Sequence, residues 1–184
     1  MNYKQLAIEG VWLLEPRIFG DSRGYFFESF KAEEFRRMVG DVTFVQENES
    51  LSSRGVLRGL HFQGGNSSQA KLVRVTEGEV LDVVVDMRHG SPTLGKYVAV
   101  NLSGDNHLQL FVPRGFAHGF VTLSPTARFQ YKVDNLYDPS SEHTLAFDDP
   151  TVGVDWQVSP SEMIISEKDR KGISFAEALT FVNE

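Results

Sequence analysis

The sequence predicts an all-β protein, an antiparallel jelly roll or barrel, in a single domain over residues 1–184. Short apolar runs recur at regular spacing, turns rich in glycine and proline separate them, and helical patterns occur only towards the two ends. Val83, Val84 and Val85 form a run that is apolar on both faces, which indicates a sheet covered on both sides. A chain of 184 residues is long enough to bury a core inside such a fold.

The composition restricts the class of partner. A net charge of −7 argues against broad nucleic-acid binding, although a local basic pocket can still hold one anionic ligand. The absence of cysteine excludes disulfides, thiolate metal sites and a cysteine nucleophile. There is no apolar run of about 18 residues and no signal-peptide pattern, so we expect a cytoplasmic protein without a membrane partner.

The N-terminal part begins with a strand and a turn. Residues 8–18 form an apolar run with Pro16 near its end, as expected of an early strand near a sheet edge. Residues 20–24, Gly-Asp-Ser-Arg-Gly, then form a turn that leads into an aromatic strand. Arg23 beside Phe26 can hold a phosphate and stack on a base; the alternative is a solvated arginine next to core phenylalanines.

A short helix and a polar strand follow. The pattern predicts a helix over residues 29–40, with Ser29 as its N-cap and a glycine at its end. Residues 44–50 alternate as a strand does, so Gln46 and Asn48 share one face. Two amides on one face can recognise a base or a sugar, although a solvent-facing strand gives the same pattern.

Residues 54–74 contain two apolar strand-like runs separated by a Gly-Gly-Asn-Ser-Ser turn, which predicts a hairpin. This hairpin would bring Arg58, His61 and Lys71 together, as an anion site beside a proton-transfer site. Arg58 and His61 would point to opposite faces of a regular strand. Their cooperation requires an irregularity, and Gly59 is a natural position for a bulge.

The middle of the chain predicts further strands. Residues 72–87 form β-branched runs broken at Glu77-Gly78, which indicates a second hairpin. A turn places His118 at the start of a later strand. In the run 127–133, apolar and polar residues alternate, so Tyr131 lies on the inward face, where its hydroxyl needs a partner.

These residues suggest proton-transfer chemistry. His61, between Leu60 and Phe62, is either a satisfied core histidine or a general base, and a carboxylate partner favours the second role. Asp169 can be that partner, although it also fits a capping box with Ser166. Tyr131 can act as an acid opposite His61, and Lys71 can stabilise an oxyanion.

A metal site is the main chemical rival. A metal-holding barrel of the cupin type carries a His-x-His pair, but residues 61–63 read His-Phe-Gln here, and only His118 resembles a later ligand. Two histidines without a carboxylate at the right spacing make a poor metal site, so we expect none. The other histidines fall in turn-like stretches and are expected to be solvated: His89, His107 and His143.

Four motifs carry a resemblance to a known family. They are residues 55–61 (Gly-Val-Leu-Arg-Gly-Leu-His), 69–73 (Gln-Ala-Lys-Leu-Val), 90–93 (Gly-Ser-Pro-Thr) and 113–120 (Pro-Arg-Gly-Phe-Ala-His-Gly-Phe). Over residues 8–169 the chain resembles the dTDP-4-dehydrorhamnose 3,5-epimerase family. The resemblance implies a cupin-type jelly roll with a few short peripheral helices, a homodimer without metal or cofactor, and a nucleotide-sugar substrate. It also implies inversion of carbons 3 and 5 of that sugar, in dTDP-L-rhamnose synthesis.

The resemblance also implies a role for each site residue. His61 is the base next to the sugar ketone, Asp169 orients it, Tyr131 is the acid on the other face, and Lys71 stabilises the enolate oxygen. The implied substrate-binding residues are Gln46, Asn48 and Arg58 for the nucleotide, Arg23, Phe26 and Glu28 from the partner subunit, and His118 and Tyr137 along the pocket.

The sequence departs from the family pattern in two places, and three alternative functions remain. Residues 64–68 lack the prolines usual in the family, and Phe147 stands where tryptophan is typical, so we expect a changed loop and changed packing near the pocket rim. The alternatives are an enzyme that inverts one carbon only or acts on another nucleotide sugar, a non-catalytic sugar-binding cupin, and a metal-dependent cupin enzyme.

Overall fold

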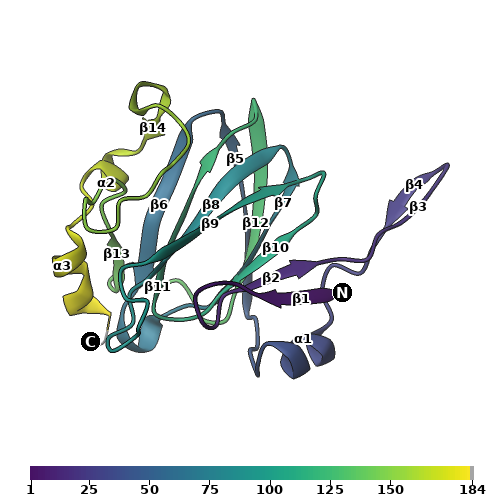
Figure 1. The fold of residues 1–184 in the computed structure, drawn as a ribbon, viewed down its shortest axis with the longest axis horizontal. Coiled ribbons are helices and arrows are strands. Elements are labelled where there is room, and N and C mark those ends of the chain that lie inside the picture. The colour runs from purple at the N-terminus through teal and green to yellow at the C-terminus, as the bar shows by residue number, and fades with distance from the viewer. Residues whose placement is uncertain (183–184) are drawn as a thin grey trace.

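The computed structural model of the protein describes residues 1–182 and consists mainly of two facing β-sheets (Figure 1). The first sheet contains, in spatial order, β1 (Asn2–Gln5), β2 (Trp12–Glu15), β10 (Gln109–Val112), β7 (Lys71–Glu77), β12 (Thr126–Val133) and β5 (Gln46–Ser53). The second contains β13 (Glu142–Thr144), β6 (Val56–Gln63), β11 (Phe116–Thr122), β8 (Glu79–Asp86) and β9 (Tyr97–Ser103), with β14 (Ile164–Ile165) beside β6. All pairs are antiparallel except β14 with β6. The fold is the predicted jelly roll; the last two residues of the predicted domain lie outside the described range.

Short helices cover the outer faces of both sheets (Figure 1). They are α1 (Ala32–Met38), α2 (Glu167–Arg170) and α3 (Phe175–Ala178), with 3-10 turns at Gly65–Ser67, Pro160–Glu162 and Leu179–Phe181. Within residues 1–182, no helix has the length and apolar character needed to cross a membrane. Phe35 of α1 packs on the first sheet, and Phe175 and Ala178 of α3 pack on the second.

The N-terminal segment differs from the prediction in two places. Residues 8–18 are a strand only over Trp12–Glu15, because Gly10, at φ +88°, turns the chain between β1 and β2. The N-cap of α1 is Lys31 rather than Ser29, and its side chain makes no capping hydrogen bond. Ser29 lies outside the helix, and its carbonyl oxygen accepts a hydrogen bond from Gln109 Nε2 (2.7 Å).

The hydrophobic core has three layers, which explains why β8 is buried along almost its whole length. Val84 lies between the sheets with Phe129, whereas Val83 and Val85 lie behind the second sheet, against Trp156. A third cluster packs α1 under the first sheet. The prediction from the valine run, a sheet covered on both sides, is confirmed.

Both predicted hairpins are wrong, because the strands in each pair belong to different sheets. Residues 64–70 carry the chain from β6 in the second sheet to β7 in the first. The chain returns to the second sheet at Gly78, where a Cβ atom would collide with the carbonyl of Thr126. Alternation identifies strands and turns, but it does not identify which strands are hydrogen-bonded. The result still places Arg58, His61 and Lys71 together, across the interior instead of along one hairpin.

A two-stranded arm leaves the body of the molecule. β3 (Phe19–Asp21) and β4 (Gly24–Phe26) form an antiparallel hairpin that projects away from both sheets (Figure 1). The predicted turn and aromatic strand are present. The alternative that these phenylalanines belong to the core is wrong, because Phe19 is 52% exposed and Phe26 is 70% exposed.

Candidate active site

The site lies between the two sheets, in two adjoining cavities of about 310 and 270 Å³. Such a volume, with a few polar groups that converge on it, is typical of a small-molecule site. Four predicted residues line both cavities, His61, Lys71, Tyr131 and Tyr137, and so does Glu142, which was not predicted. The other predicted residues that line one of them are Gln46, Asn48, Arg58 and His118. The structure therefore gathers eight of the predicted site residues around one space.

His61 and Asp169 form a hydrogen-bonded pair beside the cavity. His61 Nε2 lies 2.6 Å from Asp169 Oδ1, and the Asp169 side chain is buried. Burial alone would raise the pKa of Asp169, but hydrogen bonding and charge from His61, with Ser166 and the Gly59 N–H, leave it below its usual range. Ser166 also caps α2 by accepting a hydrogen bond from the Asp169 N–H (3.1 Å). Asp169 thus both pairs with His61 and takes part in the cap of α2, as the sequence allowed.

An irregularity at Gly59 allows Arg58 and His61 to face the same cavity. On β11, the partners of His61 and Arg58 are His118 and Phe120, so three steps along β6 match two steps along β11. Gly59 has φ +123°, and a Cβ atom there would lie 2.6 Å from the Cα of a facing glycine. The predicted bulge is confirmed.

Lys71 lies in the site near a buried aspartate–histidine pair. Burial lowers the pKa of Lys71 to about 8, and the nearby carboxylates of Glu142 and Asp82 act in the opposite direction. Asp82 is fully buried on β8, 2.9 Å from His118 Nε2. Burial raises the pKa of Asp82, opposed by His118 and by Lys71. Sequence reasoning missed Asp82, although a single acid inside a run of buried valines and leucines is a usable signal.

Tyr131 lies opposite the two amides predicted on β5. Tyr131 and Asn48 are cross-strand partners, and Gln46 Nε2 donates to Asn48 Oδ1 (2.9 Å). Burial raises the pKa of Tyr131, although the hydrogen bond with Asn48 acts in the other direction. The phenol therefore keeps its proton at neutral pH, as a general acid requires.

Glu142 is a site residue that the sequence did not reveal. It accepts a hydrogen bond from the Tyr137 hydroxyl (2.7 Å) and forms an ion pair with Lys168. Burial would raise the pKa of Glu142, but Lys168, Tyr137 and His61 together lower it. β13 has only three residues within a turn-rich segment, so no periodic pattern marks this position.

The three residues expected from a partner subunit lie away from this cavity. Arg23 and Phe26 line a separate hollow of about 330 Å³ on the arm, and Glu28 is exposed at its base. The Arg23 backbone N–H and side chain both donate to Asp21. Within one chain, the structure does not bring these residues to His61.

The histidines do not form a metal-type cluster. Within residues 1–182, no group of three or more histidine, aspartate and glutamate side chains is arranged to hold a metal ion. His61 and His118 are cross-strand partners, but each is bonded to its own carboxylate. His89 is exposed as expected. The prediction of solvated rings is wrong for His107, which stacks on Tyr25 and Phe27, and for His143, which stacks on Phe181.

The fold and the cavity define the class: a jelly-roll protein of the cupin type with a small-molecule site between its sheets. Residues 5–177 match the family model described as dTDP-4-dehydrorhamnose 3,5-epimerase. The chain belongs to this family and is an epimerase.

Known relatives extend this likeness over nearly the whole chain. A dTDP-4-dehydrorhamnose 3,5-epimerase from Pseudomonas aeruginosa is 50% identical over 98% of this chain and 99% of its own. One from Salmonella typhimurium is 54% identical over 83% of this chain and 84% of its own. A dTDP-6-deoxy-D-glucose-3,5-epimerase from Legionella pneumophila, solved in complex with dTDP-4-keto-L-rhamnose, superposes with a TM-score of 0.93 at 42% identity. That superposition covers 100% of this chain and 98% of the other.

Proposed function

We propose that the protein inverts carbons 3 and 5 of dTDP-4-dehydro-6-deoxy-D-glucose, which gives dTDP-4-dehydro-L-rhamnose for dTDP-L-rhamnose synthesis. The observation that carries this proposal is the His61–Asp169 pair at 2.6 Å, whose imidazole lines one cavity with Lys71 and Tyr131. Membership of the family supports the substrate class, as does the Legionella relative with its bound dTDP-4-keto-L-rhamnose.

The four groups supply what epimerisation next to a ketone requires. The carbonyl at carbon 4 acidifies the hydrogens on carbons 3 and 5, so His61 takes a proton from one of these carbons and becomes an imidazolium paired with Asp169. The electrons of the broken C–H bond move to the carbonyl oxygen, where the Lys71 ammonium stabilises the enolate. Tyr131 then returns a proton to the same carbon from the opposite face, and the enolate collapses to the ketone. Solvent resets Tyr131 and His61, and the sequence repeats at the second carbon without a cofactor.

The remaining residues suit the nucleotide. Arg58 is exposed at the cavity, with its Nε held by Ser52 Oγ (3.1 Å), and its remaining N–H groups can bind a diphosphate. Gln46 and Asn48 present amides that can recognise a base or a sugar. His118 and Tyr137 complete the wall around the sugar.

The arm completes the site of a second copy in the proposed homodimer. Its aromatic side chains are exposed, and it projects away from both sheets of its own chain (Figure 1). In a two-fold dimer, each arm serves the other subunit, with Arg23 on a phosphate, Phe26 stacked on the base and Glu28 beside them.

Proton exchange in heavy water tests the reaction. The purified protein is incubated with dTDP-4-keto-6-deoxyglucose, and NMR follows deuterium and configuration at carbons 3 and 5. Deuterium with inversion at both carbons supports the double epimerase. The same result at one carbon makes the protein a mono-epimerase, and no exchange at either carbon with this or other nucleotide sugars leaves a binding protein.

Active-site complementation tests the arm. Chains with His61→Asn and chains with Arg23→Ala are mixed after unfolding and refolded together. If each arm serves its partner, about a quarter of all sites in a random mixture of two-fold dimers combine both intact residues. At low substrate concentration the mixture should then exceed both parents refolded alone. Activity no higher than their average would contradict the exchange of arms.

A further inference from the structure

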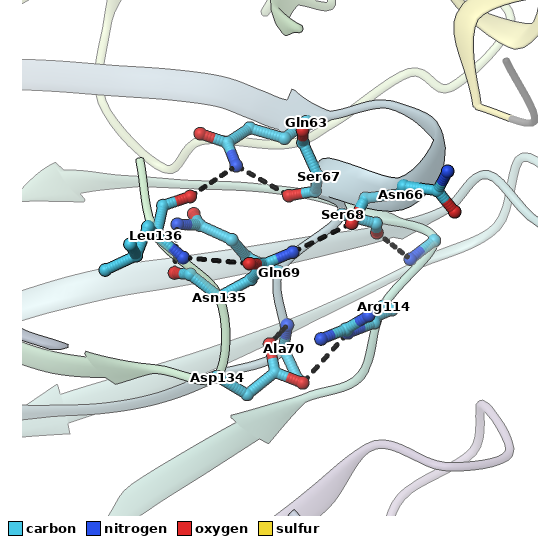
Figure 2. A network of polar contacts seen from close by, with 11 residues as sticks. Gln63, Asn66, Ser67, Ser68, Gln69, Ala70, Arg114, Asp134, Asn135 and Leu136 are labelled. Carbon is cyan, nitrogen blue, oxygen red and sulfur yellow. Dashed lines mark hydrogen bonds and ion pairs between the residues drawn. The ribbon is translucent and has the colours of Figure 1, made fainter. Parts of the chain in front are cut away.

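A polar network at the cavity rim joins two loops of the chain (Figure 2). Residues 64–70 connect β6 to β7, and residues 134–141 connect β12 to β13. Both loops reach the cavity, the first through Gln69 and the second through Tyr137. The network therefore determines the shape of this side of the site.

Gln63, the last residue of β6, lies at the centre of the network. Its Nε2 donates to the carbonyl oxygens of Ser67 (2.6 Å) and Leu136 (3.2 Å), as Figure 2 shows. Its Oε1 accepts a hydrogen bond from the backbone N–H of Asp138 (2.9 Å). Gln63 is buried, with an exposed fraction of 7%. A buried amide that uses both N–H groups and its oxygen has one favoured orientation, because any rotation leaves polar atoms unpaired.

These contacts hold both peptide groups that flank Tyr137. The Leu136 carbonyl belongs to the peptide before Tyr137, and the Asp138 N–H belongs to the peptide after it. One side chain therefore determines the position of the Tyr137 Cα from two sides. The tyrosine hydroxyl in turn donates to Glu142 at the cavity wall.

Apolar packing does little to hold this loop. Leu136 is 63% exposed and Tyr137 is 52% exposed, so the loop buries little hydrophobic surface. Its other anchors are polar: Gln69 Nε2 donates to the Asn135 carbonyl oxygen (2.8 Å), and Ser67 Oγ donates to Asp138 Oδ2 (2.7 Å). Hydrogen bonds from Ser140, Ser67 and Ser141 hold the pKa of Asp138 well below its usual range, so it stays an ionised acceptor.

We propose that Gln63 is a positioning residue of the site, which acts through Tyr137. Gln63 lies two residues after His61 on β6 and also lines the cavity, so it links the strand of the base to the loop of the tyrosine. This inference deepens the proposed function and rests on it. The residue that would be the second histidine of a metal-holding His-x-His pair is a hydrogen-bonding anchor instead.

A double-mutant cycle tests this role. Gln63→Met removes all three hydrogen bonds, and we expect KM to rise about tenfold, as for loss of one or two net hydrogen bonds to a binding group. We expect kcat to change less than KM. In a Tyr137→Ala background, the same Gln63→Met change should leave KM nearly unaltered, because the group that Gln63 positions is already absent. Equal fold-changes in the two backgrounds would overturn the proposal, as would an unchanged KM in the first.

A second variant and a control separate positioning from loss of the fold. Gln63→Glu keeps the length and still accepts from Asp138 N–H, but it cannot donate to either carbonyl, so it should reproduce most of the KM effect. Asn101→Leu removes another side-chain amide, which donates to Glu79 Oε1 (2.9 Å) in the second sheet and lines neither cavity, so it should leave KM unchanged. If neither Gln63 variant raises KM although both fold, the proposal is wrong.

Hydrogen exchange provides a readout that needs no substrate. In Gln63→Met, the amides of residues 135–141 should exchange faster than in the unaltered protein, while those of the core strands should not. Unchanged protection of this loop would overturn the proposal even if the protein is active. If the unaltered protein converts no nucleotide sugar, the proposed function fails, while this exchange measurement still decides whether Gln63 holds the loop.

Discussion

The cavity wall and the arm both present aromatic and charged side chains on short strands, yet their environments are opposite. On β12, Phe129 is buried and Tyr131 is held against Asn48 by the neighbouring strand. On the arm, Tyr25 is 61% exposed and Arg23 donates its hydrogen bonds to Asp21 of the same hairpin. Burial shifts pKa values in the cavity wall, whereas the arm keeps its aromatic side chains exposed. In the proposed function, the first environment suits proton transfer and the second suits contact with another molecule.

The largest expected effect comes from the cavity wall. His61→Ala should reduce kcat by about a thousandfold, because a positioned general base contributes this much in many enzymes. Steady-state kinetics with the nucleotide sugar measures the loss, and deuterium uptake at carbons 3 and 5 should fall in parallel. His89→Ala is the matched control, since His89 is exposed and bonded only to a backbone carbonyl. Near-normal turnover of His61→Ala would remove it from the role of base.

Lys71→Met should reduce kcat by about a hundredfold, as expected for loss of one group that stabilises an oxyanion. The pH profile gives a sharper test. The ammonium form is the active one and its pKa is about 8, so activity should fall as pH rises through about 8. Lys71→Arg, which keeps its charge, should lack this decline. An identical alkaline limb in both proteins would mean that another group titrates there.

Lys71 should make stability rise with pH, whereas it makes activity fall with pH. Its folded-state pKa of about 8 lies below its ordinary value of 10.5, so the unfolded chain binds more protons between these two pH values. The contribution of Lys71 to the free energy of unfolding therefore rises with pH from about 8 to about 10.5. Urea unfolding at a series of pH values measures this rise in the free energy of unfolding. The rise should be absent in Lys71→Met and should end above about pH 10.5 in the unaltered protein.

A smaller effect is expected on the arm. Arg23→Ala should raise KM about tenfold with kcat nearly unchanged, because the lost charge-assisted hydrogen bonds hold the phosphate in ground state and transition state alike. Arg36→Ala is the control, since Arg36 is also exposed and paired with a nearby aspartate. A fall in kcat with unchanged KM would assign Arg23 to the chemical step.

The smallest effect concerns the core beneath the cavity wall. Thr122 on β11 is fully buried, and within residues 1–182 its hydroxyl has no hydrogen-bond partner. Thr122→Val removes an unpaired polar group at nearly constant volume, so we expect Tm to rise by about 2–4 °C, as for about 1 kcal/mol in a chain of this size. Thr122→Ser keeps the hydroxyl and should lower Tm. A large loss of stability in Thr122→Val would show that the hydroxyl is satisfied in solution.

The sequence predicted the strands and most of the residues around the cavity, but not the connections between strands. The run Val83–Val85 predicted a sheet covered on both sides, and the spacing of Arg58 and His61 predicted a bulge at Gly59. The predicted strand pairing was wrong because alternation is a local property, whereas the sheet to which a strand belongs depends on the path of the connecting residues 64–70. Glu142 escaped notice because its role depends on Tyr137 and Lys168, which meet it only in the folded chain.

The pairing of His61 with Asp169 also sets an order of events during synthesis. The two residues are 108 positions apart, and the parallel contact of Ile164 with Val56 places α2 beside β6. A nascent chain that has not yet reached residue 169 has a complete strand for the base but no carboxylate to orient it. In the proposed mechanism, activity after refolding therefore requires that this C-terminal segment has docked beside β6.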